Sequence, residues 1–133
     1  TVQKLTNLAE NYDVSELANN FLAKNKKKIS KILNENNYSE EDCILILRTI
    51  LSKTKRLISI KEECEETKNV NQIIENFKPP IFWKDKEVVK VQVNAWELRD
   101  LKAKMYQINE VERLVKSSSK NSLNLVSDFI LNY

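Results

Sequence analysis

The chain has 133 residues, of which 41% are hydrophobic and 31% charged, and a formal net charge of +3. This length fits one domain with a buried core, and this composition is typical of a soluble globular protein. The sequence contains no glycine, which excludes the glycine-dependent loops that cradle phosphates, and no histidine, which removes the usual general base and the commonest metal ligand. Because the absence of glycine also disfavours hairpin turns, we expect an all-α fold, a bundle of six or seven helices.

The beginning of the chain predicts two helices joined by a lysine-rich stretch. Residues 1–8 are expected to be the end of a preceding element, and the start at Thr1 rather than methionine suggests a fragment of a longer protein. Apolar residues from Val14 to Leu22 then follow one helical face, and a second helix continues from Ile29. Five lysines have no acid among them: Lys24, Lys26, Lys27, Lys28 and Lys31. They are typical of a solvated face, and the alternative is a weak DNA-contact patch, because lysines attract phosphate without reading sequence.

A long helix is predicted from Ser39 to about Glu66. Ser39 followed by acids up to Asp42 is typical of a capping box, in which side chains satisfy free N–H groups of the first turn. Cys43 and Cys64 fall on this helix about 31 Å apart, too far for a disulfide, and two isolated cysteines cannot hold zinc. We therefore expect no metal and no cofactor. The basic residues expected mainly on the exposed side are Lys53, Lys55, Arg56 and Lys61.

The segment FKPPIFWKDKEVVKVQV, residues 77–93, combines a helix break with an aromatic pair. Pro79 disfavours helix at the residue before it, and Pro80 suits the first turn of a new helix. The residues that then fit one buried helical face are Phe82, Val89, Val93 and Trp96. The valines alone alternate as in a strand, but no partner strand is evident, so we predict a helix.

The remaining residues predict one long helix and a short last one. Apolar residues recur at helical spacing from Leu98 onward, and Glu112 and Lys116 form an i,i+4 ion pair of the favourable order. The stretch SSSKNS at 117–122 breaks this helix, and residues 123–133 form the last one. No nucleophile, base or carboxylate pair stands in a recognisable motif, so we expect no catalytic residue.

Three parts of the chain carry a shared pattern: DVSELANNFLAKNKKKISKILNE with CILILRTILSKTKRLISIK, then PPIFWKDKEVVKVQVNAW, then LRDLKAKMYQINEVERLVKSSS. Taken in order, they resemble the C-terminal part of the delta subunit of the bacterial DNA polymerase III clamp loader. The matching positions are the pair Leu47 and Arg48, Trp96 at the end of the proline–aromatic segment, and the pair Glu112 and Lys116. Glu97 departs from the family, in which a serine that can cap the helix is common at this position.

The resemblance implies that residues 1–8 end a small lid-like domain and that residues 9–133 form the collar domain, through which clamp-loader subunits assemble. It implies a non-catalytic scaffold in the bacterial cytoplasm, within an assembly that is a DNA-directed DNA polymerase. The implied partners are the delta prime and gamma/tau subunits. The sliding clamp and primed DNA are reached only through the complete protein and complex, and no membrane is involved.

Aromatic residues are the candidates for a binding surface. Phe82, Trp83 and Trp96 are expected either in the core of the domain or at a subunit interface, where large aromatic side chains are enriched. Two other interpretations stay open. One is an independent nucleic-acid-binding module that uses the lysines from Lys24 to Lys31, and the other is a small helical enzyme, which the lack of histidine disfavours.

Overall fold

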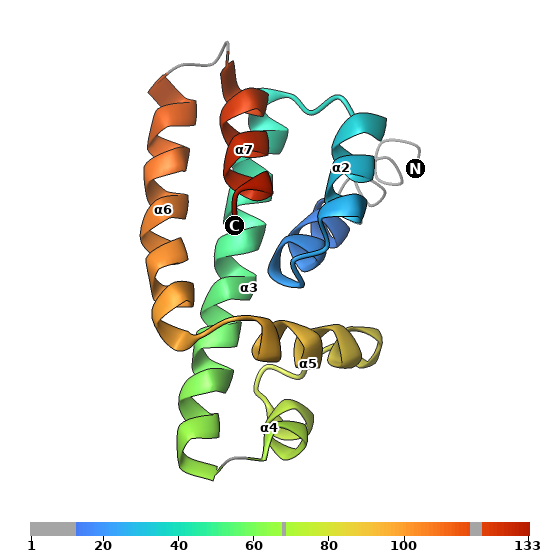
Figure 1. Ribbon diagram of the computed structural model, residues 1–133, viewed down its shortest axis with the longest axis vertical. Helices are drawn as coiled ribbons and strands as arrows, with labels where there is room; N and C mark the ends of the chain where they lie inside the picture. The colour runs from blue at the N-terminus through green and yellow to red at the C-terminus, as the bar shows by residue number, and fades with distance from the viewer. Residues whose placement is uncertain (1–12, 68, 118–120) are drawn as a thin grey trace.

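The computed structural model describes residues 13–67, 69–117 and 121–133, and all regular structure in these ranges is helical (Figure 1). A first helix, helix 13–22, spans residues 13–22. It is followed by α2 (Lys26–Glu35), α3 (Glu40–Thr67), α4 (Val70–Asn76), the 3-10 turn η1 (Trp83–Asp85), α5 (Lys86–Ala95), α6 (Leu98–Ser117) and α7 (Ser122–Leu131). The expected all-α fold is therefore confirmed. Residues 1–8 and half of the expected break at 117–122, residues 118–120, lie outside the described residues.

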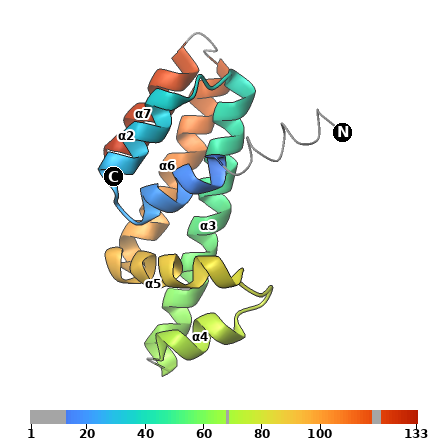
Figure 2. The same ribbon diagram turned by 90° about the vertical axis from the view of Figure 1, so that its right-hand side faces the viewer.

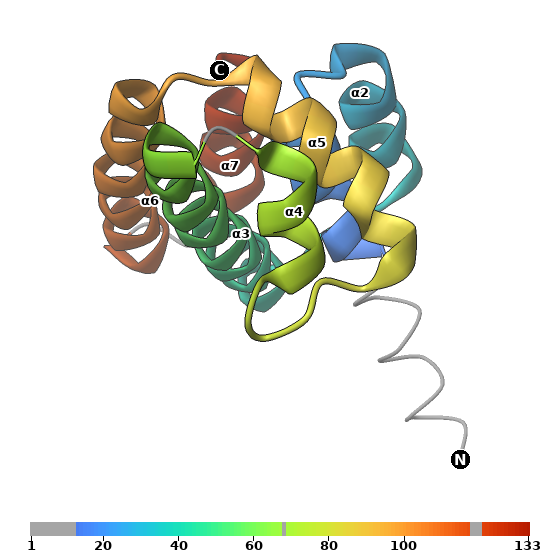
Figure 3. The same cartoon turned by 90° about the horizontal axis from the view of Figure 1, so that it is seen from below.

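Helix α3 is the longest helix, and the other helices are arranged around it. In Figure 1, α6 lies on one side of α3 and α7, and helix 13–22 and α2 lie on the other side. Helices α4 and α5 lie next to each other, and both contact α3 (Figure 3). Burying one leucine or isoleucine contributes about 1.5–3 kcal/mol relative to leaving it exposed. Helix α3 buries Cys43, Ile46, Leu47, Ile50, Thr54, Leu57, Ile58 and Ile60.

Side chains cap the starts of several helices. As predicted, Ser39 and Asp42 form a capping box: Ser39 Oγ accepts from the Asp42 N–H at 3.2 Å, and Asp42 Oδ2 accepts from the Ser39 N–H at 3.0 Å. Asn25 caps α2 and Asn69 caps α4, each accepting from the N–H three residues later. Asparagine side chains thus cap the starts of two helices, α2 and α4.

At the end of helix 13–22, a lysine takes the left-handed backbone conformation that glycine usually adopts. Lys24 has φ 58°, in the left-handed region, and two hydrogen bonds close the turn: Asn25 N–H to Asn20 O at 2.9 Å and Lys24 N–H to Phe21 O at 3.1 Å. This is the Schellman pattern, which usually has glycine where Lys24 stands. A residue with a Cβ pays roughly 1–2 kcal/mol for this conformation. The contacts of the Lys24 side chain and carbonyl, described below, help to hold it.

The structure corrects the prediction for the proline segment. Residues 77–82 are not helical, η1 begins at Trp83, and α5 begins only at Lys86, so Pro80 does not open a helix (Figure 2). Phe82 is exposed and Ile81 is buried in its place. The reason is that the backbone at Phe82 is not helical (φ −55°, ψ 133°), so the helical spacing that grouped Phe82 with Val89 does not apply there. The rest of the predicted buried face is confirmed, since Val89, Val93 and Trp96 are buried.

Candidate functional site

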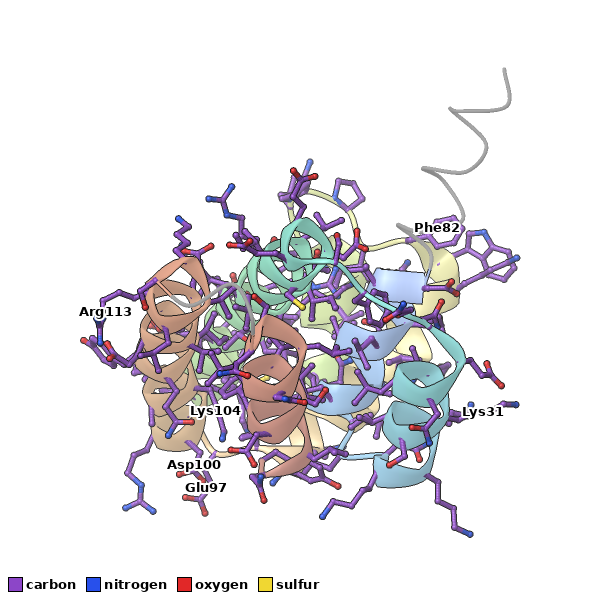
Figure 4. All side chains as sticks on the ribbon, turned by 90° about the horizontal axis from the view of Figure 1, so that it is seen from above. Lys31, Phe82, Glu97, Asp100, Lys104 and Arg113 are labelled. Carbon is purple, nitrogen blue, oxygen red and sulfur yellow. The ribbon has the colours of Figure 1, made fainter. Side chains whose placement is uncertain are left out.

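The three candidate aromatic residues separate into one core residue and one exposed pair. Trp96 is only 4% exposed, whereas Phe82 is 57% and Trp83 69% exposed. The rings of Phe82 and Trp83 lie 6.0 Å apart between centroids, and Lys84 Nζ lies 5.4 Å from the Trp83 ring. Figure 4 shows Phe82 at the periphery of the molecule. We call Phe82 and Trp83 the aromatic pair.

Trp96 connects α5 to the end of helix 13–22. Its indole Nε1 donates to the Leu22 carbonyl at 2.7 Å, and Gln92 Nε2 donates to the Asn19 carbonyl at 3.0 Å. Leu22 lies at the end of its helix, where carbonyls lack partners within the helix, and a buried carbonyl without a partner destabilises the fold. The Asn19 carbonyl also accepts from the Ala23 N–H. Trp96 also packs against Phe21, with ring centroids 6.0 Å apart. Trp96 is therefore a residue of the core that satisfies the helix end.

Two lysines flank the Trp96 ring. Lys24 Nζ lies 4.3 Å and Lys104 Nζ 6.0 Å from its centroid, and Lys104 Nζ also lies 5.3 Å from the Phe129 ring. Lys104 donates to Gln107 Oε1 at 3.0 Å. Burial lowers the pKa of Lys104, the charge of Lys24 lowers it further, and Asp100 opposes the shift. These contacts are structural, because Lys104 is buried between α6 and α7 (Figure 4).

The structure divides the five lysines of the predicted DNA-contact patch. Lys24 lies over Trp96, and Lys26 Nζ lies 5.8 Å from the Tyr133 ring, so both contact aromatic rings of the same chain. Lys27, Lys28 and Lys31 are exposed on α2, and Figure 4 shows Lys31 projecting outward. Lys24 and Lys26 are exposed as well, so all five lysines remain on the surface, two of them beside aromatic rings.

A second basic surface, which the sequence reasoning missed, lies along α3. The segment 77–80 borders a groove of about 600 Å³ beside α3, which we call the α3 groove. Its lining contains five cations and no carboxylate: Arg48, Lys53, Lys55, Arg56 and Lys78. The sequence placed Lys53 and Arg56 on the exposed side of the helix, but both are partly buried, and burial is the main cause that lowers the pKa of each. The cluster of basic residues at 53–56 was visible in the sequence, but its distant partner segment was not.

An ion-pair network joins α3 to α6. Arg48 Nε contacts Glu112 Oε1 at 3.0 Å, and Lys116 Nζ contacts Glu112 Oε2 at 3.8 Å. The predicted Glu112–Lys116 pair is therefore formed, and Glu112 also links two of the stretches that carry the resemblance. Exposed pairs of this kind contribute about 0–1 kcal/mol each, so the network adds little to stability.

Within the described residues, no group of three or more acidic or cysteine side chains is placed to hold a metal ion, and Cys43 and Cys64 are free thiols. None of the helices in the described ranges combines the length and the apolar character that crossing a bilayer requires. No protein-family model matches the sequence, and searches among curated proteins and solved structures find no match either.

Proposed function

We propose that this chain is a non-catalytic subunit-assembly domain, the collar part of a clamp-loader delta subunit of bacterial DNA polymerase III. In this role it works in the cytoplasm and packs against the delta prime and gamma/tau subunits. It takes part in placing the sliding clamp on primed DNA only as a part of the complete complex. The ordered resemblance over nearly the whole chain supports this proposal.

The observation that carries the proposal is the exposed aromatic pair. Trp83 is 69% exposed, although large aromatic side chains gain most of their stabilisation when buried. The pair is held in place, because Ile81 is buried directly before it and Asp85 N–H donates to the Phe82 carbonyl at 2.9 Å. Tryptophan and tyrosine are enriched among the residues that dominate protein interfaces. A preorganised pair of this kind suits docking against a neighbouring subunit.

The packing of the resembling stretches gives further support. Arg48 and Glu112, from two of these stretches, meet between α3 and α6, and Trp96, from a third, ties α5 to helix 13–22. Positions shared with the delta-subunit family thus lie at contacts that hold the helices together. Such positions suit a scaffold domain, whose task is to present a rigid surface.

The test is co-purification of the whole chain with the delta prime and gamma/tau subunits of the same bacterium. We expect a complex for the unchanged chain and its loss for Phe82→Ala with Trp83→Ala. Tyr106→Ala is the matched control, because Tyr106 is 76% exposed on a different helix, α6, and is expected to keep the complex. A chain that runs as a monomer beside all of these subunits would contradict the collar assignment.

A further inference from the structure

The α3 groove presents basic and hydroxyl side chains along one side of a helix, and Arg48 at one end of this row is also paired with Glu112. Arg48, Ser52, Arg56 and Ser59 line it and recur at steps of four, four and three residues, so they lie on one side of α3. Residues 48 and 59 are separated by about 16 Å at 1.5 Å rise per residue. Lys55 and Lys78 widen this row, the first from α3 and the second from the segment 77–80. The groove is therefore extended rather than shaped around one small anion.

Arg56 has donor groups that no neighbour satisfies. Its Nε and Nη2 are shielded from solvent and donate to no acceptor among the described residues. These two nitrogens share one edge of the guanidinium, the edge that grips a phosphate through two parallel hydrogen bonds. Buried donors in proteins nearly always have a partner, so this pair is an exception that requires an explanation. Arg56 lines the groove, and a rotation about its outer side-chain bonds is needed to bring this shielded edge to an anion there.

The electrostatic surroundings of Arg56 favour an added anion. Burial lowers the pKa of Arg56, and the nearby Asp85 only partly opposes that effect. Burial and the charge of Arg56 also lower the pKa of Lys53, while Asp85 and Glu16 oppose the shift. Two cations that repel each other in a partly dehydrated place gain from an anion between them. Asp85 and Glu16 stand outside the lining of the groove.

The chemistry of the lining favours a nucleic acid strand over an acidic peptide. A phosphodiester chain presents acceptors along its length, at about 3.4 Å of rise per nucleotide in a duplex strand, so about five nucleotides match the groove. An acidic peptide also brings backbone N–H donors, for which the side chains of the lining offer only the hydroxyl groups of Thr49, Ser52 and Ser59 as acceptors. Phe77, Pro79 and Pro80 add apolar surface beside the cations, and nucleic-acid grooves combine positive charge with such surfaces for sugars and bases.

We propose that the α3 groove binds the phosphodiester backbone of a nucleic acid strand, with the Arg56 guanidinium gripping one phosphate and Lys55 and Lys78 contacting its neighbours. This site goes beyond the collar assignment and does not depend on it. It also differs from the lysine patch on α2, since no residue of that patch lines the groove.

The experiment measures binding of the whole chain to a labelled single-stranded oligonucleotide of about 20 nucleotides and to its duplex, by fluorescence anisotropy, at about 50 mM and about 200 mM salt. The groove variant carries Lys55→Gln, Arg56→Gln and Lys78→Gln. The control carries Lys27→Gln, Lys28→Gln and Lys31→Gln, so both lose the same charge. We expect the groove variant to bind about tenfold more weakly or worse, and the control to stay within about threefold.

Salt dependence gives a second readout. Loss of three phosphate contacts is expected to lower the slope of log affinity against log salt by about 2 on a single strand. Arg56→Lys keeps the positive charge but loses the guanidinium edge that makes two parallel hydrogen bonds. The affinity of this variant for the oligonucleotide is expected to fall between those of the unchanged chain and the groove variant. If Arg56→Gln fails to fold, as circular dichroism reports, the Lys55→Gln, Lys78→Gln double variant replaces it, because both lysines are exposed.

Three outcomes would overturn the proposal. One is the absence of oligonucleotide binding at the lower salt concentration. Another is an equal loss of affinity in the groove and control variants, which would mean that net charge alone attracts the strand. The last is polyglutamate of equal charge competing as well as the oligonucleotide does, which would assign the groove to acidic protein segments. Retained binding of either the single strand or the duplex that depends on the groove residues supports the proposal.

Discussion

Lys104 is a single residue whose charge the fold tolerates rather than requires. It is buried between α6 and α7, close to the rings of Trp96 and Phe129, with one hydrogen bond to Gln107. Aromatic faces and one amide oxygen replace only part of the water that a lysine loses. The lowered pKa of Lys104 reflects this shortfall. Its protonated form is therefore less stable in the folded than in the unfolded chain.

The pH dependence of stability follows from this pKa. In the window between the lowered folded pKa and the ordinary value of 10.5, the unfolded chain binds more protons, so stability rises with pH. We expect Lys104→Met to remove this rise, so the unchanged chain gains stability relative to the variant as the pH is raised toward 10.5. Urea unfolding at a series of pH values measures the effect.

Lys102→Met is the control for this prediction. Lys102 is exposed on the same helix, so its replacement removes one lysine without changing a buried charge. Its difference from the unchanged chain is expected to stay nearly constant with pH. A constant difference for Lys104→Met as well would show that its burial has no energetic consequence.

At the scale of one residue, the sequence could not separate Trp96 from the aromatic pair. All three are large apolar residues within one segment, and spacing alone grouped Phe82 with Trp96. Helical spacing predicted the burial of Trp96 but not its partner, the Leu22 carbonyl, which is 74 residues away in the chain and accepts its N–H. Contacts across such separations depend on the packing of whole helices, which no local pattern contains.

The capping box makes the start of α3 an element whose stability can be tested. Ser39 Oγ satisfies one of the free N–H groups at the start of this 28-residue helix. We expect Ser39→Ala to lower the free energy of unfolding by about 0.5–2 kcal/mol, the usual cost of losing such a cap. Urea unfolding followed by circular dichroism measures it.

A serine inside the same helix provides the comparison. Ser59 is exposed on α3 and has no capping role, and alanine is the better helix former, so Ser59→Ala is expected to stay within about 0.5 kcal/mol. Equal effects of the two substitutions would mean that the cap contributes nothing beyond helix propensity.

At the scale of elements, the start of α3 was the most predictable helix start, whereas the caps Asn25 and Asn69 were not predicted. Ser39 and Asp42 predicted the start of α3 because the capping box lies within four consecutive residues. The start of α5 was misplaced because Pro80 permits a helix there, whereas the chain stays non-helical through Phe82 and buries Ile81. The α3 groove was invisible for a similar reason, since Lys78 comes to it from a segment remote from Arg56.

Across the whole molecule, Phe21 is the residue on which most of the aromatic packing converges. Its ring lies 6.0 Å from Trp96, 5.4 Å from Phe129 and 6.1 Å from Tyr133, between centroids. Tyr133 also donates from its hydroxyl to the Lys24 carbonyl at 2.8 Å. Phe21 therefore joins helix 13–22 to the end of α5 and to the C-terminal residues after α7.

Replacing Phe21 is expected to weaken the whole fold and not one helix alone. Removing a buried phenylalanine side chain costs about 3–5 kcal/mol, while a domain of this size has a total stability of about 5–15 kcal/mol. We expect Phe21→Ala to lose that much in urea unfolding, with circular dichroism and tryptophan fluorescence showing the same midpoint. Trp96 reports the site of the change directly, because its ring packs on Phe21.

Phe82→Ala separates the two roles that aromatic residues have in this molecule. Phe82 is 57% exposed, so its replacement is expected to change stability by no more than about 0.5 kcal/mol while it weakens subunit assembly. Phe21→Ala should weaken assembly only as far as it unfolds the chain, so added osmolyte that restores folding should restore assembly too. Osmolyte should not rescue Phe82→Ala, because its fold is intact and the docking contact itself is lost. A large loss of stability in Phe82→Ala would instead assign the aromatic pair to the core of the domain.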